Sequence, residues 1–255
     1  MVHVDGSYRT GPRYNSDIKK NGRVDVHTSV LFTAEEFQHL SEEEGQERLD
    51  SAFCHDDFNS PNKSAFKSKN LIAGLEDLLY ICPECKADFT MKTEGTNKIK
   101  CTRCGFTASM DDRFMLRGEN GHTSPKTISE WGRFIQDEEL KRITENPRYT
   151  LKSEMKLCEH VKRNEMLSPV GVVQAVYNTE GFHLKGERYG EPFERFYSYE
   201  EYPAIHFLDK IYLVVPDNEA VICVSPPTAA QATQWAVVSE MFSMKKVQEK
   251  QLKTL

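Results

Sequence analysis

The chain has 255 residues, of which 38% are hydrophobic and 28% are charged, and its formal net charge is −6 at pH 7. This length allows one or two domains with a sizeable core. The acidic balance argues against duplex nucleic acid as the main ligand, because neutralising phosphates requires clustered Lys and Arg. No apolar stretch approaches the roughly 20 residues of a membrane-spanning helix, and the first residues lack the pattern of a signal peptide. The composition therefore predicts a cytoplasmic protein.

The N-terminal part of the chain opens without a regular pattern. Residues 5–14 are rich in turn-forming residues and show no helical period, whereas residues 23–31 alternate between apolar and polar side chains and predict a strand. Two helix starts follow, because two pairs of residues have the Ser/Thr-x-x-Glu spacing of a capping box, namely Thr33 with Glu36 and Ser41 with Glu44.

Two further helices are expected before the strand-rich part of the sequence begins. Their apolar periodicity places them at residues 70–79, with Asn70 as the cap, and at 127–146, with a capping pair at its start. Pro147 ends the second helix and marks the best candidate for a domain boundary. We therefore predict a mixed α/β region over residues 1–147 and a second domain over residues 148–255.

The second domain contains seven short apolar or alternating segments separated by turn-forming residues. This spacing predicts an antiparallel sandwich or barrel. The segments lie at residues 151–161, 170–177, 181–185, 193–199, 204–208, 211–215 and 219–224. After two consecutive prolines, Thr228 opens a final helix whose apolar side carries Trp235. The predicted order is thus seven strands followed by one capping helix.

Four of the seven cysteines form two close pairs. Cys82 and Cys85 are separated by fifteen residues from Cys101 and Cys104, a spacing typical of a four-cysteine zinc site. Each Cys-x-x-Cys turn can present two thiolates to one metal ion, and two such turns complete a tetrahedron. Gly105, directly after the second pair, can adopt the positive φ that such turns require. We predict one structural zinc ion in a ribbon over residues 80–106.

Other chemistries of the same cysteines are less favoured. A redox Cys-x-x-Cys needs only one pair, at a helix start within a βαβ unit, and neither pair has that context. Two disulfides do not fit a reducing compartment. An iron site of the rubredoxin kind uses the same ligands and stays open as an alternative. Because four thiolates leave no coordination position for water or substrate, catalysis at the metal is not expected.

Further candidate residues have plainer interpretations. The run His55-Asp56-Asp57 could gather a metal or serve acid–base chemistry, but adjacent residues in an irregular segment rarely converge, so an exposed loop is expected over residues 54–69. The remaining cysteines lack the basic neighbours of an activated thiol and are expected to be buried and structural. They are Cys54, Cys158 and Cys223.

Two basic residues fall in the first loop of the strand-rich half. Lys162 and Arg163 could contact an anionic lipid head group, and the alternative is a solvated turn. The sequence contains no Gly-rich phosphate loop, no Gly-x-Ser-x-Gly and no His-Glu-x-x-His. We therefore assign no catalytic and no organic cofactor-binding residue.

Several segments resemble a region that follows the catalytic core in Firmicute-type 1-acylglycerol-3-phosphate acyltransferases (lysophosphatidate acyltransferases). The resemblance extends from residue 5 to about residue 135 and is most specific over 69–106, where a Gly-Leu-Glu-x-Leu-Leu-Tyr-x-Cys-Pro-x-Cys block is similar. The matching segments are residues 5–14, 32–36, 69–85, 92–95 and 101–106. The remainder is similar in architecture only, because seven strands and a helix resemble a pleckstrin-homology-like barrel.

The catalytic signature of that family is missing. It places an Asp five positions after a His, and none of the eight histidines of this chain has that neighbour. The phosphate-binding Glu-Gly-Thr motif cannot be transferred to Glu94-Gly95-Thr96 either, since this tripeptide lies between the metal-ligand pairs and is typical of a turn. The resemblance therefore implies a C-terminal accessory region without the transferase core.

These observations predict an α+β protein, in which a small mixed region with a four-cysteine zinc ribbon precedes a seven-stranded antiparallel pleckstrin-homology-like barrel with a C-terminal helix. The leading functional hypothesis is a non-catalytic accessory region of a phospholipid-synthesis acyltransferase. Its partners would be the catalytic domain, in cis or in trans, and a membrane lipid surface at which the protein is peripheral. The alternatives are a stand-alone module that binds a peptide or anionic lipid and, favoured only by basic residues between the cysteine pairs, a nucleic-acid-binding zinc ribbon.

Overall fold

The computed structural model describes residues 1–12, 14, 22–160, 167–199, 201–208, 211–217 and 220–254. They form an α+β fold with two compact units, each described by itself below. Unit 1 comprises Met1–Ala73, Thr93–Lys100 and Gly105–Trp131, and unit 2 comprises Gly74–Lys92, Cys101–Cys104 and Gly132–Leu255. Among the helices in these ranges, none combines the length and apolar character needed to span a membrane.

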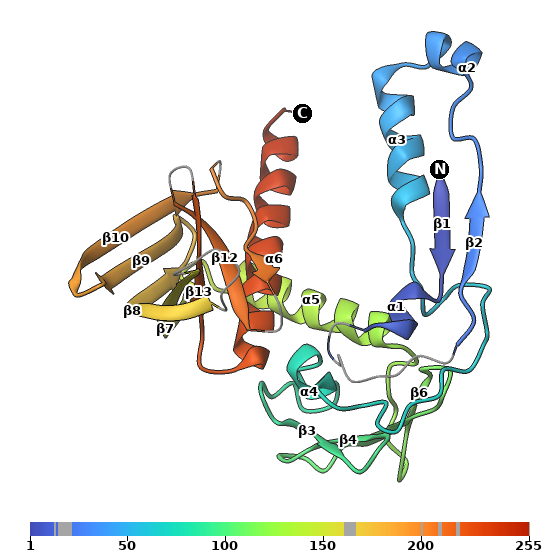
Figure 1. The fold of residues 1–255 in the computed structure, drawn as a ribbon, viewed down its shortest axis with the longest axis horizontal. Helices are drawn as coiled ribbons and strands as arrows, with labels where there is room; N and C mark the ends of the chain where they lie inside the picture. Colours follow the sequence, from blue (N-terminus) through green and yellow to red (C-terminus); the bar gives the residue numbers. More distant parts are fainter. Residues whose placement is uncertain are drawn as a thin grey trace. The chain divides into compact units, whose positions relative to one another are not determined.

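Unit 1 begins with a two-stranded antiparallel ribbon (Figure 1). Strand β1 (Val2–Asp5) pairs with β2 (Asp25–Thr28), so the strand predicted over 23–31 is confirmed in shortened form. The segment 5–14, for which no helix was expected, contains the single-turn helix α1 (Ser7–Thr10). Its turn starts at Gly6, whose φ of 91° is left-handed, and a Cβ there would lie 2.8 Å from the carbonyl oxygen of Arg23.

Both predicted capping boxes are present at the starts of α2 (Ala34–His39) and α3 (Glu42–Phe53). The backbone N–H of Glu36 donates to Thr33 Oγ1 over 3.1 Å, and the carboxylate of Glu36 accepts from the N–H of Thr33 over 2.8 Å. Ser41 and Glu44 repeat this exchange. Neither helix has a buried residue, and both carry acidic residues in their first turn.

A four-stranded sheet follows, with the strand order β3-β4-β5-β6. The chain changes from one unit to the other within the first two strands of this sheet. The strands are β3 (Met91–Glu94), β4 (Lys98–Cys101), β5 (Thr107–Met110) and β6 (Leu116–Gly118). The core of unit 1 is aromatic. The rings of Phe66 and Phe114 meet edge to face at 6.0 Å, and those of Phe106 and Trp131 at 5.6 Å.

The two helices predicted before Pro147 differ in outcome. The first is shorter than expected, because α4 covers only Leu75–Leu78 and begins at Gly74. Asn70 does not cap it; its side chain instead accepts from the backbone N–H groups of Ile72 and Ala73, which closes a separate turn. The second prediction is confirmed by α5 (Ile128–Glu145), at whose start Thr127 Oγ1 accepts from the N–H of Glu130 over 3.1 Å.

All seven predicted strands of the C-terminal half are present in unit 2. They form one antiparallel sheet in the order β10-β9-β8-β7-β13-β12-β11, curled into a half-barrel, with helix α6 (Ala229–Thr254) packed against it (Figure 1). The strands are β7 (Leu151–His160), β8 (Leu167–Tyr177), β9 (Gly181–Arg188), β10 (Glu191–Ser198), β11 (His206–Leu208), β12 (Tyr212–Asp217) and β13 (Ala220–Ser225).

Helix α6 supplies much of the core of the half-barrel. Trp235 and Phe242, both 2% exposed, contact the ring of Tyr177 from β8 at centroid distances of 6.4 and 5.5 Å. Gly186 on β9 permits a close backbone approach, since a Cβ there would lie 2.1 Å from the carbonyl oxygen of Val172. Ile143 from α5 is also part of this core. The boundary near Pro147 stays a prediction, although one helix that precedes it contributes to the core that follows.

Candidate metal centre

The four cysteines predicted to bind a metal lie together in unit 2. The Sγ atoms of Cys82 and Cys104 are 3.7 Å apart, as are those of Cys85 and Cys101, and all four lie within 4.8 Å of one another. A disulfide requires about 2.05 Å between sulfurs. Four thiolates bound tetrahedrally at about 2.3 Å from one ion lie about 3.8 Å apart. The spacing is therefore compatible with a metal site.

Two tight turns present these sulfurs. In the first turn, the N–H of Lys86 donates to the carbonyl of Cys82 over 3.0 Å, and the N–H of Cys82 donates to the carbonyl of Ala87 over 3.1 Å. The residue directly after each Cys-x-x-Cys has a left-handed backbone, with φ of 57° at Lys86 and 83° at Gly105. The positive φ expected of Gly105 is thus confirmed. Lys86 adopts the same backbone conformation although it is not a glycine, so neighbouring residues must stabilise it.

The surroundings of the sulfurs are unequal. Cys82 and Cys101 are fully buried, whereas Cys104 is exposed. Burial raises the pKa of the Cys82 thiol. Burial also raises that of Cys101, but hydrogen bonds from Thr90 and from the backbone of Cys104 and Arg103 outweigh it and lower the pKa to about 6. The Thr90 hydroxyl lies 3.2 Å from that sulfur. Hydrogen bonds of this kind orient and stabilise a thiolate ligand.

The second half of α5 supports the first cysteine turn. Lys86 Nζ lies 2.6 Å from the carboxylate of Glu138, and the guanidinium of Arg142 donates to the carbonyl of Lys86 over 3.2 Å. Arg142 also makes a two-pronged ion pair with Asp88, at 3.0 and 2.9 Å. These contacts explain how Lys86 keeps its left-handed backbone, and they fix the turn on the helix.

Glu139, one residue further along α5, connects this turn to the half-barrel. Its carboxylate is completely buried and accepts hydrogen bonds from the hydroxyls of Tyr80 and Tyr149 at 2.9 and 3.0 Å. The side-chain amide of Gln234 on α6 donates to it over 3.2 Å, and Arg142 lies 3.4 Å away. The buried charge is therefore compensated. Sequence reasoning missed Glu139, although its position carries a signal, because it lies four residues after Ile135 and four before Ile143 within the apolar stripe of α5.

The other sequence candidates divide into three outcomes. Cys158 and Cys223 are buried as predicted and lie opposite each other on β7 and β13, but Cys54 is exposed at the end of α3, so its predicted burial is wrong. Its helix has no apolar face in contact with a core. Lys162 and Arg163 lie outside the described residues.

The third outcome concerns the run at residues 55–57, which was expected to be an exposed loop. It does lack regular structure, but Asp57 is buried, and His55 and Asp57 converge with Asp5 from β1. Adjacent residues can meet at one point here because a distant strand supplies the third group. No sequence signal linked Asp5 to a residue fifty positions away.

Comparisons with protein-family models, with curated proteins and with solved structures found no match to this chain.

Proposed function

We propose that Cys82, Cys85, Cys101 and Cys104 hold one zinc ion and that its role is structural. Four thiolates are soft ligands, which favour zinc over hard cations, and a closed tetrahedral set leaves no position for substrate. The sulfur spacing of 3.7 Å and the two similar turns support this assignment. When bound, the ion would supply the positive charge that allows several thiolates to lie side by side. Iron in the same ligands is the alternative that metal analysis distinguishes.

The proposed role of the metal is to brace the half-barrel. The observation that carries it is the chain of contacts from the first cysteine turn through α5 to α6, by way of Glu138, Glu139 and Arg142. Loss of the metal would free the turn at Lys86 and so weaken the packing of α5. In this view the ion stabilises a binding or docking module and takes no part in chemistry.

We further propose that this module is a non-catalytic accessory region of a phospholipid-synthesis acyltransferase. The similarity over residues 69–106 supports it, together with the missing His-x4-Asp signature. The strand order, with the first strand of the half-barrel beside the last and a helix packed on the sheet, is the arrangement expected of the pleckstrin-homology-like proposal. The partner would be a catalytic domain that carries the His and the Asp, and the protein would act in the cytoplasm at the membrane surface.

Acyl transfer by the purified chain tests this proposal directly. The protein is incubated with a lysophosphatidate and an acyl-CoA or acyl-carrier donor, and phosphatidate is followed by mass spectrometry. We expect no turnover above the no-protein control, because esterification needs a base within reach of the hydroxyl and a group that stabilises the oxyanion. Turnover that is abolished by changing one histidine would overturn the accessory role.

Binding measurements separate the remaining alternatives. Sedimentation with vesicles of phosphatidate or phosphatidylglycerol, compared with phosphatidylcholine alone, measures a preference for anionic lipid. We expect weak or absent binding to duplex DNA at about 150 mM salt, given the acidic total charge. Micromolar or tighter DNA binding would instead favour the nucleic-acid-binding ribbon.

A further inference from the structure

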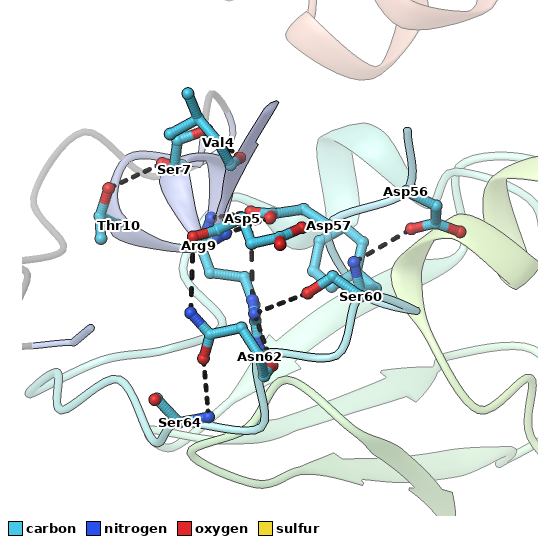
Figure 2. Close-up of polar contacts among 12 residues, drawn as sticks. Val4, Asp5, Ser7, Arg9, Thr10, Asp56, Asp57, Ser60, Asn62 and Ser64 are labelled. Atoms are coloured by element: carbon cyan, nitrogen blue, oxygen red, sulfur yellow. Dashed lines mark hydrogen bonds and ion pairs between the residues drawn. The ribbon is translucent and has the colours of Figure 1, made fainter. Parts of the chain in front are cut away.

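A second group of potential metal ligands lies in unit 1, whereas the cysteine quartet belongs to unit 2. Asp5, at the end of β1, and Asp57, in the loop after α3, are both 7% exposed. The Nε2 atom of His55 lies 3.6 Å from Asp5 Oδ1 and 3.5 Å from Asp57 Oδ1. Figure 2 shows the two aspartates close to each other beside Arg9, whereas Asp56 lies apart from them.

These separations exceed an ordinary hydrogen bond, which joins such atoms at about 2.7–3.2 Å. They match ligands that share an ion, because nitrogen and oxygen atoms bound tetrahedrally at about 2.0–2.2 Å lie about 3.3–3.6 Å apart. His27 lies on the other side of Asp5, with its Nε2 3.7 Å from Asp5 Oδ2. One carboxylate is thus placed between two imidazoles.

Asp57 is held in place before any ion binds. Its carboxylate accepts from the backbone N–H of Gly6, in a short hydrogen bond, and from that of Arg9 over 3.1 Å. Both donors belong to the turn around α1, which follows Asp5 directly. The left-handed φ of Gly6 therefore fixes Asp5 and Asp57 relative to each other. Ligating carboxylates are commonly oriented by such hydrogen bonds.

The charges at this site leave a place for a cation. Arg9 is buried, and its Nε lies 4.0 Å from Asp57 Oδ2, but its Nη2 is directed to Ser60 and to the carbonyl of Asn62. Its single positive charge acts on both Asp57 and Asp5, so the two carboxylates together exceed it by one charge. Within the described ranges, both ion-pair neighbours of Asp5 are histidines, His27 and His55. A buried carboxylate that lacks a full counter-charge is stabilised by a bound cation.

We propose that Asp5, His55 and Asp57 form a site for a divalent cation of the zinc or manganese kind, with His27 as a positioning residue for Asp5. One imidazole with two carboxylates is a donor set that both ions accept. Unlike the cysteine quartet, three protein ligands leave a position for water. Asp5 and His27 also line a pocket of about 300 Å³, and His55 is itself exposed, so the site is accessible from solvent. This inference does not depend on the role proposed for the cysteines.

Manganese is the probe that distinguishes the two sites, since thiolates prefer zinc and carboxylates accept manganese. The 255-residue chain, with the quartet loaded with zinc, is titrated with Mn²⁺, and free Mn²⁺ is followed by electron paramagnetic resonance. We expect one Mn²⁺ per chain. His55→Ala should lower the affinity for Mn²⁺ at least 10-fold, because even the hydrogen-bond partners of metal ligands cost roughly 10–100-fold when they are replaced. His27→Ala should lower the affinity by a smaller factor.

The matched control is His39→Ala, since His39 lies exposed on α2 in the same unit. It should leave Mn²⁺ affinity unchanged, and zinc content should stay at one per chain in every variant. Circular dichroism checks folding, and Asp5→Asn replaces His55→Ala if the latter does not fold. In the unaltered protein, substoichiometric Mn²⁺ should broaden the imidazole NMR signals of His55 and His27 before that of His39. Absence of stoichiometric binding, or equal affinity in His55→Ala and His39→Ala, would overturn the site.

Discussion

The hydroxyl of Tyr80, two residues before the first cysteine of the quartet, donates a 2.9 Å hydrogen bond to the buried carboxylate of Glu139. Burial raises the pKa of Tyr80 far above its ordinary value, so the hydroxyl stays a donor across the physiological range. The same carboxylate accepts from Tyr149 at the approach to β7 and from Gln234 on α6. One side chain therefore joins the cysteine turn to the half-barrel.

Replacing Glu139 tests this junction. In Glu139→Leu, the buried hydroxyls of Tyr80 and Tyr149 and the amide of Gln234 lose their shared acceptor, so the free energy of unfolding should fall by about 3 kcal/mol or more. Urea denaturation measures the change. Glu145→Leu on the exposed end of the same helix is the control and should change stability by less than about 0.5 kcal/mol. Equal effects of the two substitutions would show that Glu139 does not hold the unit together.

Metal content tests the quartet. Protein purified without added metal should contain about one zinc per chain, and Cys82→Ser or Cys104→Ser should lower both occupancy and stability. Structural zinc can contribute on the order of 10 kcal/mol to folding, so the loss should be large. Cys54→Ser is the matched control, because Cys54 is exposed and distant in sequence from the quartet. A quadruple Cys→Ser protein with unchanged stability would contradict a structural metal.

Truncation tests the predicted boundary at Pro147. A fragment of residues 149–255 contains all seven strands and α6, and the boundary predicts that it folds alone. Because Ile143 is 1% exposed within the core of the half-barrel, we expect this fragment to be less stable than one of residues 126–255. Urea unfolding followed by tryptophan fluorescence compares the two. Equal stability would mean that α5 is dispensable for the sheet.

A point substitution isolates the contribution of α5 to that core. Ile143→Ala in the full chain should cost about 2–4 kcal/mol, since it removes buried methyl groups and leaves a cavity. Val247→Ala on α6 is the control, because Val247 is 53% exposed and its truncation should cost little. Thermal unfolding reports both. An Ile143→Ala protein as stable as the control would place Ile143 outside the cooperative core.

Acidification tests the first capping box. The backbone N–H and side chain of Thr33 lower the pKa of Glu36 in the folded protein. A lowered folded pKa means that the carboxylate stabilises α2 above the unfolded pKa of about 4.3, and that this stabilisation is lost as pH falls through the folded value. A carboxyl NMR titration should show Glu36 ionising at lower pH in the native chain than in urea. Thr33→Val should reduce the difference, and identical titrations would exclude the box in solution.

Much of the fold follows from local patterns in the sequence. The capping residues Thr33, Ser41 and Thr127 begin helices because their side chains satisfy backbone N–H groups that lie nearby in the chain. The strands of the half-barrel were predictable for a similar reason, since alternation and turn residues are local signals. Asn70 shows the limit of this reasoning: its side chain bonds two neighbouring N–H groups, as a cap would, yet no helix starts there.

The parts that could not be predicted depend on contacts between distant segments. The quartet was predictable because its spacing alone brings four thiolates together. Asp5 gave no such signal. At Glu139 the helical period places an acidic residue in the apolar stripe, but only the fold brings its partners Tyr80 and Gln234 beside it. Burial of an acidic residue is decided by tertiary packing, and composition favours the opposite expectation.

Unit 2 is composed of three separate stretches of the chain, Gly74–Lys92, Cys101–Cys104 and Gly132–Leu255. Two of these stretches carry the four cysteines, and the third carries the half-barrel. One recombination point upstream of Gly74 transfers unit 2 whole, whereas a point between the two cysteine pairs or after Cys104 leaves one or both pairs behind. The transferred segment also carries Thr93–Lys100 and Gly105–Trp131 of unit 1, and a fusion protein designed around the half-barrel should begin upstream of Gly74.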